Sequence, residues 1–170
     1  MDQKSQLHEN VIDQYARCPN LLQNAVKGLA ESDLDLSEGV GSWTIRQIIH
    51  HIVDGDDIWK LFIKRAVGQP NGTFDLSWYQ QVPEQEYWSQ AWGYADRAIA
   101  PSLALFRASR AHIVQILRLI PGSLDRQLTI CKLDGSEKRV SVQDVVEMQT
   151  RHVVGHIADI QKIIAAHSSK

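Results

Sequence analysis

Four long stretches of the sequence carry apolar residues at the spacing of an α-helix, and this pattern constrains the fold more than any other feature. In the clearest stretch, 45–66, isoleucine, tryptophan and phenylalanine recur every three or four residues. The stretches 3–30, 101–120 and 142–166 follow the same period. Because each amphipathic helix has to bury its apolar stripe against another element, we expect an all-α protein, a four-helix bundle.

Residues that favour helix ends bound these stretches. Ser42 or Thr44 can cap the second helix, and Ser141 can cap the fourth. Pro101 suits the first turn of the third helix. Pro19 lies inside the first stretch and is predicted to kink or restart that helix, because proline has no amide hydrogen to donate.

Two connections between the helices have distinctive compositions. A long crossover is expected between the second and third helices, with one short helix over 84–92. Before the fourth helix, 126–140 predicts a short irregular excursion or a hairpin around Asp134-Gly135. We expect the aromatic side chains of the crossover to pack as core beneath it, and the alternatives are that they cover a pocket mouth or pair two subunits. These side chains are Trp78, Tyr79, Tyr87, Trp88, Trp92 and Tyr94.

Length, charge and cysteine content narrow the class of protein. The 170 residues suit a single domain, 1–170, and no repeat or long linker divides them. Eighteen Lys and Arg against twenty Asp and Glu provide no basic surface for a nucleic acid. No apolar run approaches the roughly 20 residues that span a bilayer. With two cysteines and no secretory signal at the first residues, we expect a cytoplasmic protein.

Three of the seven histidines are predicted to lean toward the interior of the bundle. At about 100° per residue, His51 lies about 80° from the centre of its apolar stripe, whereas His50 projects roughly opposite that stripe. On the fourth helix, His156 lies about 40° and His152 about 80° from the centre, on the same side. The sequence therefore directs three imidazoles inward from two helices.

The spacing of His152 and His156 is typical of a shared cation. Residues four apart lie one helical turn apart on one face, so both rings can bind one metal ion. A third imidazole from His51 would leave other coordination positions open for water or substrate. Gly155, between the two histidines, is expected to allow a close helix approach. The alternative is that the three rings are only hydrogen-bonded within a metal-free bundle.

Carboxylates follow two of these histidines at the same offset. Asp54 and Asp159 lie three residues after His51 and His156, where a carboxylate can accept the second N–H of a ligating ring or relay a proton. A solvated acidic face is the alternative for both. We interpret the neighbouring acids Asp56 and Asp57 as solvated.

These segments resemble the DinB/YfiT-like superfamily of metal-binding helical bundles. The segment 41–54, GSWTIRQIIHHIVD, is similar to the family's helix opening that leads to His-x-x-Asp, and 151–157, RHVVGHI, is similar to its C-terminal His-x-x-x-His. The resemblance implies that His51, His152 and His156 bind a divalent transition metal, commonly zinc or nickel. It also implies homodimers, and an activity as a metal-dependent hydrolase or as a thiol S-transferase that uses bacillithiol or mycothiol.

Two hypotheses of function follow. The first is an enzyme in which the metal activates a water or a small thiol toward a small-molecule substrate, with Asp54 or Asp159 orienting a ligand or relaying a proton. The second is a non-catalytic metal-binding dimer in a stress or sensing role. Fold analogy does not fix the substrate. The crossover over 68–98 is the segment in which we expect substrate selectivity to lie.

Overall fold

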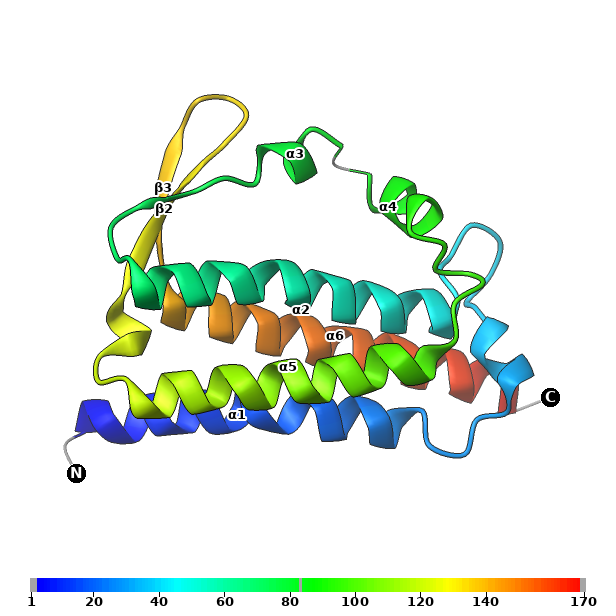
Figure 1. Cartoon of the computed structure of the whole chain (residues 1–170). Coiled ribbons are helices and arrows are strands. Elements are labelled where there is room, and N and C mark those ends of the chain that lie inside the picture. The colour runs from blue at the N-terminus through cyan, green and yellow to red at the C-terminus, as the bar shows by residue number, and fades with distance from the viewer. Residues whose placement is uncertain (1–2, 83, 169–170) are drawn as a thin grey trace.

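The computed structural model describes residues 3–82 and 84–168, and this part of the chain is mostly helical. Within it, four long helices form a bundle: α1 (Gln3–Ala25), α2 (Ile45–Gly68), α5 (Ile99–Leu119) and α6 (Val142–Ser168). Helix α1 packs against α5 and α6, and α2 packs against the same two helices. In Figure 1, α1 and α6 run in one direction and α2 and α5 in the other. The helical bundle predicted from the apolar spacing is therefore present.

The connection between α2 and α5 spans the length of the bundle. Because these two helices are parallel, the chain has to return to its starting end before α5 begins. Residues 69–82 and 84–98 form an arch that runs along α2 (Figure 1). The arch contains strand β1 (Thr73–Phe74) and the short helices α3 (Ser77–Gln80) and α4 (Gln85–Ala91). The second of these lies inside the range in which one short helix was expected.

A small sheet joins the arch to the segment before α6. Strands β2 (Gln127–Cys131) and β3 (Glu137–Ser141) form an antiparallel hairpin, which is one of the two predicted alternatives. Strand β1 pairs with β2 in parallel, with Thr73 beside Thr129. The sequence did not indicate this third strand. It follows from the free edge of β2, whose backbone groups find partners in the arch.

The remaining connections are short. They contain two 3-10 helices, η1 (Glu31–Asp35) and η2 (Ser123–Asp125). None of the helices in the described part of the chain combines the length and apolar character that crossing a membrane requires.

Pro19 neither ends nor restarts α1, contrary to one of the two predicted outcomes. The helix continues through it to Ala25, and Pro19 is buried. Proline cannot donate to the carbonyl four residues earlier, which belongs to Tyr15. The Nη1 of Arg110, on α5, donates to that carbonyl at 3.0 Å. A side chain from a neighbouring helix thus replaces the missing helical hydrogen bond.

The tryptophan and tyrosine residues of the arch contact one another. The rings of Tyr79 and Trp88 stack at 5.1 Å, and Trp92 lies 4.9 Å from Trp88. Trp78 and Tyr87 remain about half exposed, so the expectation of core packing is wrong for these two. Tyr94 is buried, with its ring 5.7 Å from that of His50 on α2, so the expectation of core packing is confirmed for this residue.

Candidate metal centre

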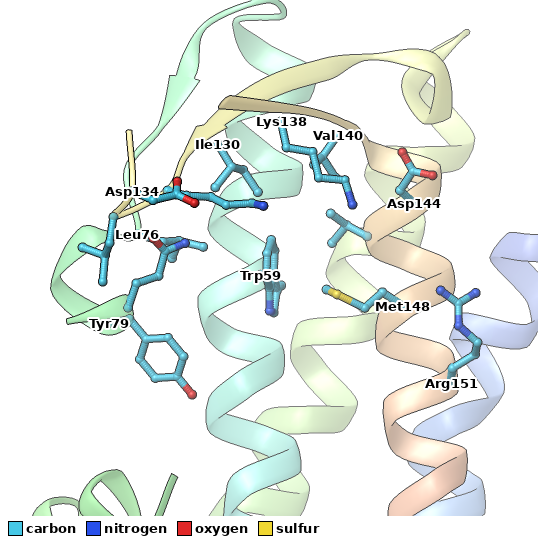
Figure 2. Close-up of a pocket in the computed structure, with 14 residues that line it drawn as sticks. Trp59, Leu76, Tyr79, Ile130, Asp134, Lys138, Val140, Asp144, Met148 and Arg151 are labelled. Atoms are coloured by element: carbon cyan, nitrogen blue, oxygen red, sulfur yellow. The ribbon is translucent and has the colours of Figure 1, made fainter. Parts of the chain in front are cut away.

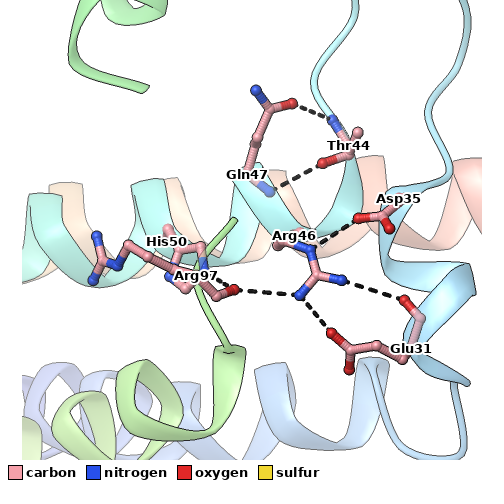
Figure 3. Close-up of polar contacts among 7 residues, drawn as sticks. All are labelled: Glu31, Asp35, Thr44, Arg46, Gln47, His50 and Arg97. Atoms are coloured by element: carbon pink, nitrogen blue, oxygen red, sulfur yellow. Dashed lines mark hydrogen bonds and ion pairs between the residues drawn. The ribbon is translucent and has the colours of Figure 1, made fainter. Parts of the chain in front are cut away.

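Contacts at the start of α2 fix the direction of the histidines that follow. Thr44 is the cap: its Oγ1 accepts from the Gln47 amide at 3.2 Å, and the Gln47 Oε1 accepts from the Thr44 amide at 2.9 Å. Arg46 pairs with Glu31 at 2.7 Å and with Asp35 at 2.8 Å, which ties α2 to η1 (Figure 3). The first turn of α2 is therefore held from two sides.

The three histidines predicted as ligands come together between α2 and α6. One ring nitrogen from each of His51, His152 and His156 lies within 4.8 Å of the other two. The Nε2 atoms of His51 and His152 are 2.9 Å apart. The ring centroids are separated by 4.7 to 5.1 Å, with interplanar angles of 71° to 89°. Rings that are nearly perpendicular direct their nitrogens into one shared space rather than stacking.

The hydrogen-bond partners of the three rings are few. His156 donates from Nδ1 to the Asp159 Oδ2 at 2.9 Å, which leaves the lone pair of that ring on Nε2. His51 and His152 contact each other through Nε2 and can share one proton there. The Nδ1 of His152 is buried without a hydrogen-bond partner among the described residues. The predicted contact between Asp159 and His156 is thus present in the geometry.

Burial keeps two of the three rings neutral at physiological pH. It lowers the pKa of His51 to about 3, and the nearby rings of His152 and His156 add to this effect. Burial also lowers the pKa of His152 to about 4, with further contributions from His156 and Arg110. Neutral imidazoles keep a lone pair that a cation can accept.

The donor set fits a divalent transition metal. Two nitrogens on one tetrahedral ion, each about 2 Å from it, lie about 3.3 Å apart. One pair of nitrogens, 2.9 Å apart, lies close to that value, and the other separations, at most 4.8 Å, would shorten on binding an ion. Neutral imidazoles suit zinc, nickel, copper and iron. The ring of Trp43 contacts that of His51, with the centroids 4.8 Å apart.

Asp54 lies in a different environment from the one predicted for it. Its Oδ2 pairs with Nη1 of Arg97 at 2.8 Å. Among the described residues, no hydrogen bond joins Asp54 to His51. The end of the arch brings Arg97 to α2, and a guanidinium competes for a carboxylate more strongly than a neutral imidazole does.

His50 is fully buried, and the prediction that it projects away from the core is wrong. Its Nδ1 lies 2.9 Å from the Ser102 Oγ and its Nε2 lies 3.1 Å from the carbonyl oxygen of Arg97. The first turn of α5 and the end of the arch cover this face of α2, part of which is drawn in Figure 3. A single apolar stripe could not reveal a second buried face.

The interpretation of Asp56 as solvated is also wrong. Asp56 pairs with Arg110 at 2.8 Å, and their side chains are 2% and 1% exposed. Asp57, interpreted in the same way, is nearly half exposed and pairs with Lys60. A signal for the buried pair was present: Asp56 lies four residues after Ile52 on the apolar stripe of α2, and Arg110 lies four residues after Phe106 on that of α5.

The close helix approach expected at Gly155 is absent. A Cβ added to Gly155 would meet nothing within 4 Å, because this residue faces outward. Gly55, on α2, lies nearer to the histidines: a Cβ there would be 3.8 Å from Cε1 of His152.

Comparison with known proteins assigns this chain to a family. The sequence model of the DinB superfamily matches residues 14–160, and the chain belongs to this superfamily. It is similar to a protein of Bacillus mycoides (strain KBAB4), with 25% identity over 161 residues that cover 91% of this chain and 87% of that protein. A protein of Bacillus cereus (strain AH820) is 26% identical over 165 residues, which cover 94% and 90% of the two chains. Both relatives carry the provisional name of metal-dependent hydrolase.

A solved structure has the same fold. YfiT from Bacillus subtilis matches with a TM-score of 0.80 over 99% of this chain and 90% of its own, at 19% sequence identity. That protein is described as a probable metal-dependent hydrolase with an unusual four-helix bundle topology. At this identity the likeness establishes the fold, and the activity of this chain has to be argued from its own residues.

Proposed function

We propose that this protein is a metal-dependent hydrolase of a small-molecule substrate, with zinc or nickel held by His51, His152 and His156. The observation that carries the proposal is the convergence of three imidazole nitrogens from two helices within 4.8 Å. The provisional names of its relatives support the same class of reaction. Three protein ligands leave room in the coordination shell, which is typical of a catalytic site and not of a closed structural one.

Each residue near the centre has a separate task in this proposal. When bound, the ion supplies a Lewis acid and lowers the pKa of a water or thiol in its open position. Asp159 holds the ring of His156 in the tautomer whose Nε2 can bind a cation. Trp43 packs against the ring of His51 and limits its movement. Asp54, 19% exposed and paired with Arg97, keeps the predicted proton-relay role only as a hypothesis.

The test is turnover by the metal-reconstituted full chain. Purified protein is loaded with zinc or with nickel and offered a panel of esters and amides, then low-molecular-weight thiols together with electrophiles. We expect hydrolysis that disappears with a chelator and in His51→Ala, and persists in His112→Ala, which alters an exposed histidine on α5. Turnover only with a thiol would replace hydrolysis by the thiol S-transfer that the family resemblance suggests.

Absence of turnover in every screen, with the metal bound, would favour the non-catalytic metal-binding dimer. The homodimer itself stays a prediction, and light scattering of the purified protein measures it directly.

A further inference from the structure

A cavity of about 850 Å³ lies between α2, α6, the arch and the β2–β3 hairpin, apart from the three histidines. Its size is within the range of small-molecule pockets, roughly 300–1,000 Å³. Val145, Leu76 and Ile130 form buried apolar parts of its wall. Figure 2 shows Trp59 on α2 opposite Met148 on α6. The wall therefore provides a flat aromatic surface and a flexible thioether for an apolar ligand.

Cationic side chains without strong partners surround the cavity. Lys132 and Lys138 form no ion pair with any described residue, and Arg151 has one long contact, 3.7 Å to Glu147. Figure 2 shows Lys138 extending from the hairpin toward α6, and Arg151 at the end of the cavity near Met148. Side chains of this kind could neutralise a negatively charged group at the mouth.

The two acidic residues that line the cavity are engaged locally. The Asp134 Oδ1 accepts from the Ser136 amide at 2.9 Å, and the Asp144 Oδ2 accepts from the Ser141 amide at 2.9 Å and from its hydroxyl at 2.7 Å. These bonds lower the pKa of both carboxyls and hold the carboxylates in a turn and a helix start. Neutral donors leave the two carboxylates charged, so the three cations Lys132, Lys138 and Arg151 give the lining one net positive charge.

The cavity and the histidines lie along the same two helices. Met148 precedes His152 by one helical turn on α6, about 6 Å along the axis. Trp59 follows His51 by eight residues on α2, about 12 Å along the axis. A ligand held in the cavity is therefore one to two turns from the candidate metal centre, within reach of a molecule with a chain of several carbons.

We propose that this cavity binds an amphipathic carboxylate, with its apolar body between Trp59 and Met148 and its carboxylate at Lys138 and Arg151. Because Arg151 directly precedes His152 on α6, the carboxylate lies at the end of the cavity nearer the histidines, where the acid released from an ester or amide would lie; esters and amides of such acids are then the substrate class of the proposed hydrolase. The assignment of a substrate class rests on the proposed function, whereas binding of the carboxylate in the cavity does not require a metal. The planar fork of Arg151 and the ammonium of Lys138 recognise the charge, and the apolar wall selects the body.

The experiment measures binding of octanoate to the metal-free full chain by NMR titration, beside octylamine of equal chain length. We expect one saturable site for octanoate, with an affinity at least about tenfold higher than that of octylamine. The cations of the cavity attract the carboxylate of octanoate and repel the ammonium of octylamine. Lys138→Glu is expected to weaken octanoate about tenfold. The matched control, Lys64→Glu, reverses an exposed charge of α2 that does not line the cavity, and is expected to change affinity less than twofold.

A second variant, Met148→Trp, fills the cavity and is expected to abolish octanoate binding while far-UV circular dichroism stays unchanged. Equal affinity for octanoate and octylamine, or equal effects of Lys138→Glu and Lys64→Glu, would overturn the proposal. Binding should survive His51→Ala, and its loss in that variant would also overturn a cavity site independent of the metal centre. Retained octanoate binding without any metal-dependent turnover would keep this site and remove the proposed hydrolase.

Discussion

His50 and His51 are adjacent in α2, yet their rings have opposite surroundings. Both ring nitrogens of His50 have partners outside the histidine group, Ser102 and the Arg97 carbonyl, and the ring is fully buried. Among the described residues, His51 has one hydrogen-bond partner, the Nε2 of His152. The difference teaches that burial alone does not identify a ligand. A histidine whose nitrogens are already satisfied supports the fold, and one whose nitrogen faces other imidazoles is available to a cation.

The same difference separates the Arg110–Asp56 pair from the three histidines. The guanidinium of Arg110 donates to Asp56 and to the carbonyls of Tyr15 and Gln149, so it joins α5 to three other helices. The histidines join only α2 and α6 and keep lone pairs. We therefore expect substitutions in the first group to reduce folding stability, and substitutions in the second group to reduce metal affinity.

The largest effect is expected for Arg110→Met, which leaves Asp56 buried without its cation. An uncompensated buried charge typically costs 3–5 kcal/mol, and chemical denaturation in the presence of a chelator measures it. The control is Arg118→Met, which removes an exposed arginine that pairs with Glu9 and Asp13 and should cost less than about 1 kcal/mol. Equal losses for the two variants would contradict the structural role of the buried pair.

His50→Ala is expected to lower the free energy of unfolding by about 2–4 kcal/mol, because it opens a cavity and leaves two buried partners unsatisfied. Metal affinity of the folded protein should remain within twofold of the wild type. His112→Ala, at an exposed position of α5, should change stability by less than about 0.5 kcal/mol. A large loss of metal affinity in His50→Ala would remove the distinction between the two adjacent histidines.

The apolar periodicity and the residue spacing of the sequence predicted the features that are set within a single helix. The apolar stripe of α2 and the four-residue spacing of His152 and His156 belong to this class. The burial of His50 depends on the arch, and the continuity of α1 through Pro19 depends on Arg110. Such contacts join residues far apart in the sequence, so no local pattern encodes them. The position of Asp54 beside Arg97 has the same origin.

Asp159→Ala is expected to weaken metal binding about tenfold, because His156 loses the acceptor that orients its ring. Isothermal titration with zinc measures the change. Asp57→Ala provides the control, since this exposed carboxylate pairs with Lys60. An affinity in Asp159→Ala equal to that of the control would mean that the contact at His156 contributes nothing to the centre.

The smallest effect on metal binding is expected for Asp54→Ala. Because Asp54 pairs with Arg97, zinc affinity should change less than twofold, and stability should fall by no more than about 1 kcal/mol. A tenfold loss of affinity would restore the original prediction that Asp54 orients His51.

Metal content of the purified chain tests the central claim most directly. Wild-type protein, His51→Ala and His50→Ala are incubated with zinc or nickel, desalted and analysed by mass spectrometry for bound metal. We expect about one ion per chain in the wild type and in folded His50→Ala, and none in His51→Ala. An unchanged ion content and Kd in His51→Ala would contradict a centre built from these three imidazoles.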